Sequence, residues 1–280
     1  MMNLLKSSAI WFRTISRRRW VQFTSLILSN AYFLSWLRFI PCSTLNCSNC
    51  GLATFTCPLI LLQRGAIFAS MGMMGIMFWK IVGSIIIALA LLFLFGAALG
   101  TWTCGWLCPF GFLQDLLHKI PTRKWTLPLW AGGFRLPLFF ILVGILPYLT
   151  NSFVFCDLCP PGTITRLTQQ VAGIPLFLRA PEGMMAILSL LSLSGFLLAA
   201  LFIHRPFCTL LCPIGGIYGL SNKFSGLFLH LKEESCNQCR RCVKSCPQGI
   251  DPVKDPNHTL CSRCLECTGH CPALSIDVKI

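Results

Sequence analysis

Residues 236–247 read CNQCRRCVKSCP and residues 261–272 read CSRCLECTGHCP, so the C-terminal region carries one four-cysteine pattern twice. Both copies have the spacing C-x2-C-x2-C-x3-C-P, and the second begins 25 residues after the first. Four thiolates are the ligand set of one [4Fe–4S] cluster. The repeated pattern therefore predicts two such clusters in a small domain over residues 231–280.

The order of the cysteines also predicts which cluster each of them binds. In two-cluster bacterial ferredoxins the three closely spaced cysteines of a run hold one cluster, and the cysteine before proline reaches the other. The predicted ligands of the first cluster are Cys236, Cys239, Cys242 and Cys271. The predicted ligands of the second cluster are Cys261, Cys264, Cys267 and Cys246. Zinc is the competing metal, but it favours paired C-x2-C sequences separated by longer loops.

Four basic side chains lie among these cysteines. They form either a docking face for an acidic partner or a plain solvated surface, and they are Arg240, Arg241, Lys244 and Arg263.

The rest of the chain has the composition of a membrane protein. Of its 280 residues 55% are hydrophobic and 11% charged, with a mean hydropathy of +0.69, whereas soluble domains carry about 25% charged residues. A secreted disulfide scaffold is the alternative for a chain with 18 cysteines, but such scaffolds lack long apolar runs. Four runs approach the roughly 20 residues that span a bilayer; they are about Val21–Pro41, Gly75–Gly100, Leu129–Asn151 and Gly183–His204. Arg38 and Arg135 lie near span ends and are expected to snorkel to the interface.

The distribution of Lys and Arg predicts the orientation of these spans. Both residue types gather before the first run, between the second and third, and after the fourth, so we expect both termini on the cytoplasmic side of a bacterial-type inner membrane. The formal charge of +14 is then a topology signal, and nothing in it indicates nucleic acid. The expected organisation is a basic N-terminus over 1–20, two-span repeats over 21–128 and 129–230, and the cluster domain over 231–280. The fold class is thus mostly α, a four-helix transmembrane bundle with a small ferredoxin-like domain.

A second cysteine motif supports the two-span repeat. Residues 104–111 read CGWLCPFG and residues 208–215 read CTLLCPIG, 104 residues apart and each following an apolar run. Repeats of equal orientation are related by an axis along the membrane normal, which could bring the two pairs together. This predicts a third [4Fe–4S] cluster with ligands Cys104, Cys108, Cys208 and Cys212. The alternative is cysteines placed by chance at helix ends, each followed by a helix-stopping proline.

The remaining cysteines follow the first and third runs, on the expected outer face. Four of five could hold a fourth cluster, and these are Cys47, Cys50, Cys57, Cys156 and Cys159. Cys42 stands apart as a spare. Disulfides are the alternative, because an oxidising compartment permits them.

The stretch FGFLQDLLHKIP after the first C-x3-C-P motif carries two ionisable side chains. Asp115 and His118 lie three residues apart, on one face of an amphipathic helix, and His titrates near working pH. The pair could handle the protons of a quinol, or it could be the polar face of an interfacial helix. We assign no catalytic residue beyond these two candidates.

Taken together, the four spans, the two C-x3-C-P motifs and the double ferredoxin motif resemble the membrane-bound NapH-type polyferredoxins. The chain is also similar to the iron–sulfur half of the nitrous-oxide-reduction regulators. The resemblance implies a quinol dehydrogenase or electron-transfer subunit of a larger redox complex, with clusters at the cysteines named above. The outer sequences LNCSNCGLATFTCP and FCDLCPPG depart from the simplest members.

Three functions fit these features. The first is an electron-transfer subunit that works between the quinone pool and a partner enzyme. The second is a transmembrane electron conduit without quinone chemistry of its own. The third is a redox-sensing regulator or metal-transport accessory. Partners expected from the sequence are membrane lipid, other subunits of a redox complex and quinone.

Overall fold

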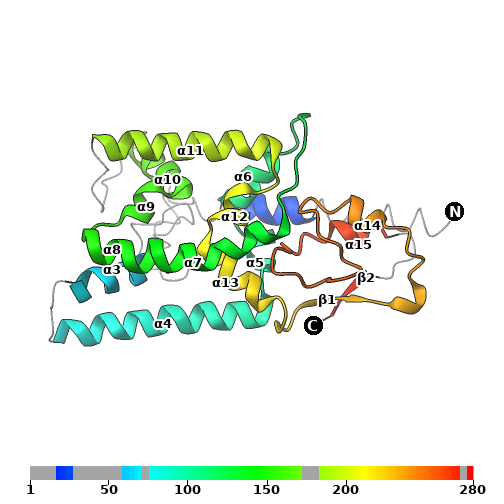
Figure 1. Cartoon of the computed structure of the whole chain (residues 1–280), viewed down its shortest axis with the longest axis horizontal. Coiled ribbons are helices and arrows are strands. Elements are labelled where there is room, and N and C mark those ends of the chain that lie inside the picture. Colours follow the sequence, from blue (N-terminus) through cyan, green and yellow to red (C-terminus); the bar gives the residue numbers. More distant parts are fainter. Residues whose placement is uncertain (1–16, 28–58, 71–75, 172–182, 272–275, 280) are drawn as a thin grey trace. The chain divides into compact units, whose positions relative to one another are not determined.

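The chain is mostly helical, as the composition predicts (Figure 1). The computed structural model describes residues 17–27, 59–70, 76–171, 183–271 and 276–279. These residues fall into two compact units. Unit 1 contains residues 94–135 and 201–280 together with the N-terminal residues to Ser25, and unit 2 contains residues 26–93 and 136–200.

Two described helical segments are long and apolar enough to cross a membrane. They are the continuous run Leu129–Thr150, of 22 residues, and α11 (Met184–Phe202), of 19 residues. Helix α4 (Ile76–Leu99) has 24 residues and contains the apolar segment Ile85–Leu99. Large apolar side chains such as Phe93 and Leu198 are more than 60% exposed, as expected for helices whose apolar surface meets lipid. Of the first predicted span, residues 21–27 belong to a described helix over residues 17–27, and residues 28–41 lie outside the described residues.

The segment Leu129–Thr150 changes its helical pitch along its length. It begins as the 3-10 helix η3 (Leu129–Phe134), continues as α7 (Arg135–Phe139), widens into the π-helix η4 (Phe140–Ile145) and ends as α8 (Leu146–Thr150). Proline lacks the N–H that would bond to the carbonyl four residues back and its ring crowds that carbonyl. The wide turn η4 ends just before α8, whose second residue is Pro147. Helices commonly depart from ideal pitch near a proline.

Arg135 does not snorkel, so that prediction is wrong. Its side chain is only 5% exposed. The guanidinium donates to the carbonyls of Gly132, Gly215 and Thr259 at 3.1, 3.1 and 3.3 Å. A planar fork of five N–H donors suits this task, and the arginine thereby ties η3 to two other segments of unit 1.

Unit 2 is built on α3 (Leu59–Ser70), which packs against η4 and α8. The short helix α9 (Val154–Leu158) follows α8, and α10 (Pro160–Val171) begins two residues after α9 ends. Gln63 is among the fully buried side chains of this unit. The unit also includes most of α11, whose Ser192 hydroxyl donates to the Leu158 carbonyl at 2.9 Å.

Unit 1 contains two similar helix pairs and the C-terminal domain. The first pair is α5 (Trp102–Trp106) and α6 (Pro109–Leu117), and the second is α12 (Pro206–Leu210) and α13 (Pro213–Ser221). Each pair carries one C-x3-C-P motif, so each pair positions the two cysteines of that motif.

The C-terminal domain is closed by a two-stranded antiparallel sheet. Strand β1 (Phe228–Leu231) pairs with β2 (Ile276–Lys279) in the register Phe228 opposite Lys279. Between the strands lie the one-turn helices η5 (Glu233–Ser235), α14 (Arg241–Lys244) and α15 (Glu266–Gly269). A small core forms around Leu229, Cys242 and Cys267, so two cysteines take the place that aliphatic side chains hold in most domains.

Candidate metal centre

The two C-x3-C-P motifs fold into the same local structure. Cys104 and Cys208 are each the third residue of a five-residue helix, α5 or α12. Cys108 and Cys212 follow in extended conformation, with φ/ψ of −71°/115° and −67°/112°. A residue before proline avoids the helical region, and proline is favoured at the first position of a helix. The sequence therefore forces each second cysteine out of helical geometry at the start of α6 or α13.

The four cysteines of these motifs lie together, and their thiols interact. Burial raises the pKa of Cys104 well above its usual value, and the neighbouring Cys212, Cys108 and Cys208 raise it further. Burial likewise raises the pKa of Cys208, as do Cys212 and Cys108, and it raises that of Cys212 to about 11. A bound metal would replace these thiol protons, because cysteine binds metals as the thiolate. We call this set of four residues the paired-motif site.

Several polar groups of unit 1 are directed at the paired-motif site. The amide of Gln114, which is 1% exposed, donates to the Cys208 sulfur at 3.3 Å. The Cys108 and Cys212 sulfurs accept from the backbone N–H of Gly111 and Gly215, both at 3.5 Å. Hydrogen bonds to sulfur are among the factors that set the potential of an iron–sulfur cluster. These donors fit a group that leaves negative charge on the sulfurs.

Within the described residues no group of three His, Cys, Asp or Glu side chains lies close enough to hold one metal ion. Zinc and a [4Fe–4S] cluster both accept four cysteine ligands.

The tail motifs wrap their cysteines with matching backbone strain. Gln238 and Arg240 flank Cys239 with φ of 52° and 54°, and Arg263 and Leu265 flank Cys264 with φ of 50° and 63°. Residues other than glycine rarely adopt positive φ, and such positions gather at binding sites. Turns of this kind direct backbone N–H groups into a concavity that binds anions. A cluster with thiolate ligands is such an anion.

The tail thiols fall into two neighbourhoods. The pKa of Cys242, raised by burial, is raised further by Cys271 and then by Cys239. Burial and then Cys264 and Cys246 raise the pKa of Cys261 to about 12. Thus Cys246, from the first motif copy, lies with the second copy. This is the neighbourhood that crosswise ligation requires, and the ligation itself stays a prediction.

The tail backbone lies directly against the paired-motif site. A Cβ added at Gly105 would come within 2.2 Å of the Ser262 carbonyl oxygen, and one at Gly219 within 2.2 Å of the Thr259 oxygen. The Asn222 amide donates to the Cys261 carbonyl at 2.9 Å. A cavity of about 30 Å³ is lined by cysteines of both sites, namely Cys104, Cys208 and Cys261. The two cysteine sets are therefore neighbours within unit 1.

Arg263 anchors this contact and does not contribute to a docking face. Its side chain is 0% exposed, and it donates to the carbonyls of Leu99 and Asn222 and to the Ser225 hydroxyl, at 2.9, 2.9 and 2.7 Å. The other three basic residues of the predicted surface are exposed, and these are Arg240, Arg241 and Lys244. The surface prediction is thus wrong for Arg263.

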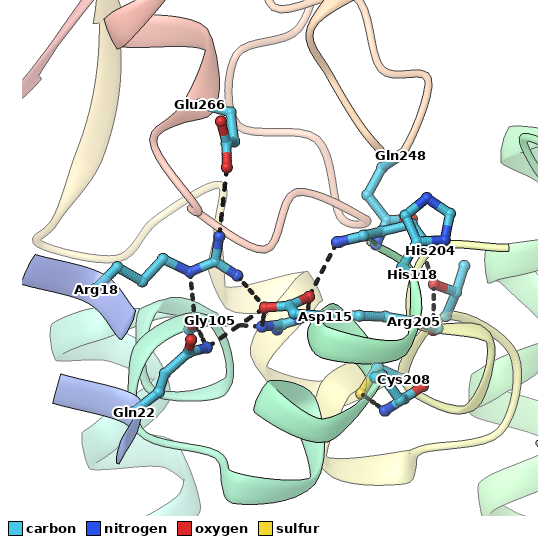
Figure 2. Close-up of polar contacts among 12 residues, drawn as sticks. Arg18, Gln22, Gly105, Asp115, His118, His204, Arg205, Cys208, Gln248 and Glu266 are labelled. Carbon is cyan, nitrogen blue, oxygen red and sulfur yellow. Dashed lines mark hydrogen bonds and ion pairs between the residues drawn. The ribbon is translucent and has the colours of Figure 1, made fainter. Parts of the chain in front are cut away.

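Asp115 is the centre of a buried charge network (Figure 2). Arg205 contacts both carboxylate oxygens at 2.7 and 2.6 Å, Arg18 donates at 2.5 Å, and His204 Nε2 lies 3.1 Å away. Burial alone would raise the pKa of Asp115, but Arg205, His204 and Arg18 hold it well below its usual range. The polar-face interpretation of this residue is therefore wrong, because its carboxylate faces the interior of unit 1.

A cavity of about 230 Å³ opens beside this network. Its lining includes both residues proposed for quinol protons, Asp115 and His118, together with His204 and Pro247. The His118 and His204 rings meet edge to face at 5.3 Å. Pro247 directly follows Cys246, so the cavity reaches one of the tail cysteine sets.

Of the predicted outer cysteines only Cys156 and Cys159 are described, in and after α9 of unit 2. The others lie outside the described residues, and they are Cys42, Cys47, Cys50 and Cys57.

Helical spans, paired cysteine motifs and a two-motif tail define an iron–sulfur protein with apolar helices. Residues 81–128, 133–179 and 185–232 each match the model of a family described as a 4Fe-4S binding domain. The chain belongs to this family.

Named relatives support the same class. The chain is 28% identical to an uncharacterized protein of Methanocaldococcus jannaschii over 68% of its own length and 76% of the relative. It is 28% identical to the YccM protein of Escherichia coli over 61% of its length and 49% of the relative. It is 27% identical to the ferredoxin-type protein NapH of E. coli over 52% of its length. The chain thus spans about half of YccM and of NapH. No solved structure matches it significantly.

The family matches also reveal a repeat that is shorter than the predicted two-span repeat. The matched segments begin at residues 81, 133 and 185, which are 52 residues apart. Cys104, Cys156 and Cys208 occupy the same position in the three segments. The 104-residue repeat is therefore two copies of a 52-residue unit, and each unit holds one apolar helix and one cysteine motif. The middle unit is harder to recognise in the sequence because its cysteines have the spacing C-x2-C and not C-x3-C.

Proposed function

We propose that this chain is a membrane-embedded electron-transfer subunit that relays single electrons between the quinone pool and a redox partner. Three [4Fe–4S] clusters would supply the one-electron chemistry when bound, two in the tail domain and one at the paired-motif site. The chain itself would hold their ligands and fix the distance between them.

The observation that carries this proposal is the contact between the tail and the paired-motif site. Gly105 and Gly219 leave room for the backbone of residues 259–263, and Asn222 holds the Cys261 carbonyl there. Because Cys104, Cys208 and Cys261 line one small cavity, electrons could pass from one cysteine set to the other over a short distance. A redox-sensing regulator would need neither this contact nor several neighbouring cluster sites.

The 52-residue repeat supports the proposed four-span topology with cytoplasmic termini. If each unit crosses the membrane once, successive motifs emerge on alternating sides. Cys104 and Cys208 then share the cytoplasmic side with the tail, and Cys156 lies opposite. The charge distribution argues for the same orientation.

For quinol, the cavity beside Asp115 is the proposed headgroup site. Asp115 is already bound by two arginines, so it is a poor proton acceptor. His118 lines the same cavity and is not among the described ion-pair partners of Asp115, which makes it the better of the two candidates. The apolar side chains of Phe112 and Leu116 in the lining suit a ring and its isoprenoid tail.

The test is a count of iron and acid-labile sulfide in the purified chain with Cys208→Ser. We expect the variant to lose about four irons, the content of one cubane, while the signals of the tail clusters in electron paramagnetic resonance persist. Leu220→Ser serves as the control, because that side chain is exposed. An unchanged iron count in Cys208→Ser, with normal folding, would remove the third cluster and with it the proposed relay.

A further inference from the structure

Arg135 brings a positive charge to the paired-motif site. Its Nη1 donates to the carbonyls of Cys208 and Gly215, at 3.4 and 3.1 Å, and the whole side chain is 5% exposed. Arg135 also lines the cavity of about 30 Å³ that Cys104 and Cys208 line. The guanidinium therefore lies beside cysteines of both motifs.

Helix α13 leaves room for this charge. A Cβ added at Gly215 would lie 3.8 Å from Arg135 Nη1, and one at Gly219 would lie 3.5 Å from Nη2. A Cβ added at Gly216 would lie 3.4 Å from the Arg135 Cβ. Three glycines of one helix thus lie next to the same arginine, and a longer side chain at any of them would occupy the space beside it.

The two motifs differ in how they neutralise the arginine beside them. Arg205 donates to the Cys104 carbonyl at 2.9 Å and is paired with the carboxylate of Asp115. Asp115 is the seventh residue after the second cysteine of its motif, and the corresponding residue of the other motif is Gly219. The second motif therefore has a glycine where the first has the counter-charge of its arginine.

Within the part of the chain that the structure describes, no carboxylate takes that place for Arg135. None of the described ion pairs includes it, and its hydrogen bonds go to backbone carbonyls. The ionisable groups that interact with it electrostatically are Cys212, Cys208 and Cys104. The counter-charge of this buried guanidinium would thus come from the cysteines of the site once they are ionised.

A buried charge is costly unless an opposite charge lies near it. A bound cluster with its thiolates is a net anion, and a one-electron reduction adds one more negative charge. The attraction between this charge and a guanidinium is stronger in the protein interior than in water. A positive charge at this position therefore favours the reduced state of the bound group over its oxidised state.

We propose that Arg135 is the counter-cation of the paired-motif site, where its charge raises the midpoint potential of the bound cluster. This inference rests on the proposed function, which places a cluster at the site and supplies the electron from quinol or from the redox partner. The cluster gains one electron, Arg135 keeps its proton, and no bond forms or breaks. The site then accepts electrons more readily than it would without the guanidinium.

The test is a redox titration of the full chain, purified anaerobically and followed by electron paramagnetic resonance. The signal of the paired-motif site is the one that Cys208→Ser removes. Arg135→Gln is expected to keep the wild-type iron count and to lower the midpoint of that signal. At a fixed potential the ratio of reduced to oxidised cluster should fall about tenfold, which is about 59 mV for a one-electron couple.

Two further variants separate charge from other effects. Arg135→Lys keeps the positive charge and should recover most of the shift. Arg123→Gln removes an exposed positive charge of unit 1 and should leave the midpoint unchanged. A wild-type midpoint in Arg135→Gln would overturn the inference. An equal shift in Arg135→Lys would also overturn it, because the geometry of the hydrogen bonds and not the charge would then be responsible.

Should Arg135→Gln fail to fold, infrared difference spectra decide. In a chain with isotope-labelled guanidinium groups, reduction of the wild type should shift an arginine band, and this change should be weaker in Arg135→Lys. Identical difference spectra for the two proteins would overturn the inference.

The outcome for Cys208→Ser separates this inference from the proposed function. If that variant keeps the wild-type iron count, no cluster is bound at the site and both fail. If it loses its iron while Arg135→Gln titrates as the wild type does, the cluster stands and only the role of Arg135 is refuted.

Discussion

At the scale of single residues, three buried arginines of unit 1 hold separate backbone segments together. Arg135, Arg205 and Arg263 are each at most 5% exposed, and each donates to carbonyls of segments distant in sequence. Burying a guanidinium costs less when its donors are satisfied, and among the described residues Arg263 Nε is the one donor of these side chains recorded as buried without a hydrogen-bond partner. Among the described residues, Arg205 is the one of these three that also binds a carboxylate, that of Asp115.

Replacing Asp115 by Ala should destabilise the protein strongly. Removal of one partner from a buried pair costs about 3–5 kcal/mol, because Arg205 would be left buried without its counter-charge. The measurement is the unfolding midpoint in detergent, with Glu234→Ala as the control since Glu234 is exposed. Equal midpoints for the two variants would show that the network does not contribute to stability.

The same carboxylate gives a pH dependence of defined sign. Its pKa is depressed in the folded state, so its stabilisation is complete above the unfolded carboxyl pKa of about 3.9 and is lost as pH falls through the folded pKa. We expect the gap in unfolding midpoint between the wild type and Asp115→Asn to stay constant from pH 7 to about 5. Below about 4 the gap should narrow, and a gap that widens there would contradict the assignment.

At the scale of elements, the short helices determine where the cysteines point. Both C-x3-C-P motifs place one cysteine inside a five-residue helix and the other at the first turn of the next helix. Glycines within or just after the motifs then admit the tail segment 259–263. In this contact the tail backbone approaches the glycines closely, so a single methyl group added at one of them would disturb it.

Gly219→Ala should loosen the tail. The new Cβ would overlap the Thr259 carbonyl oxygen, and overpacking of this kind costs about 1–3 kcal/mol. Limited proteolysis should cleave the variant faster within residues 255–265 than the wild type. Gly195→Ala is the matched control, because nothing lies within 4 Å of that position. Identical cleavage of both variants would argue against a seated tail.

The sequence was informative where the relevant spacing is local. The tail motifs and the conformation of Cys108 and Cys212 follow from neighbouring residues, and the mostly helical class follows from the apolar runs. The roles of Arg135, Arg263 and Asp115 could not be predicted, because their partners lie far along the chain, 164 residues away for the Arg263 contact with Leu99. Gln114 was missed although a local signal exists, namely its place six residues after Cys108.

At the scale of the whole molecule, the three family matches describe a tandem array. Each member of the array joins one apolar helix to one cysteine motif, and the tail domain follows the last member. Because adjacent members would face opposite sides of a membrane, motifs of the same side are those two members apart. The contact of Gln114 with Cys208 follows this rule within unit 1.

Reporter fusions test the alternation directly. A reporter fused after Ile280 should be active only in its cytoplasmic mode, and one inserted after Gly173 only in its periplasmic mode. The expectation follows from the Lys and Arg distribution and the 52-residue period. Matching activity at both positions would be incompatible with one crossing per repeat, and a periplasmic signal after Ile280 would invert the orientation.

The 52-residue period has a consequence for how such a chain could grow or shrink. Gain or loss of one unit would reverse the membrane side of every motif that follows, and would carry the tail domain to the wrong compartment. Gain or loss of two units would leave all sides unchanged. If each unit crosses the membrane once, as proposed, the array would obey a parity rule: viable length variants should differ by about 104 residues, and a variant differing by 52 should need a compensating extra helix elsewhere.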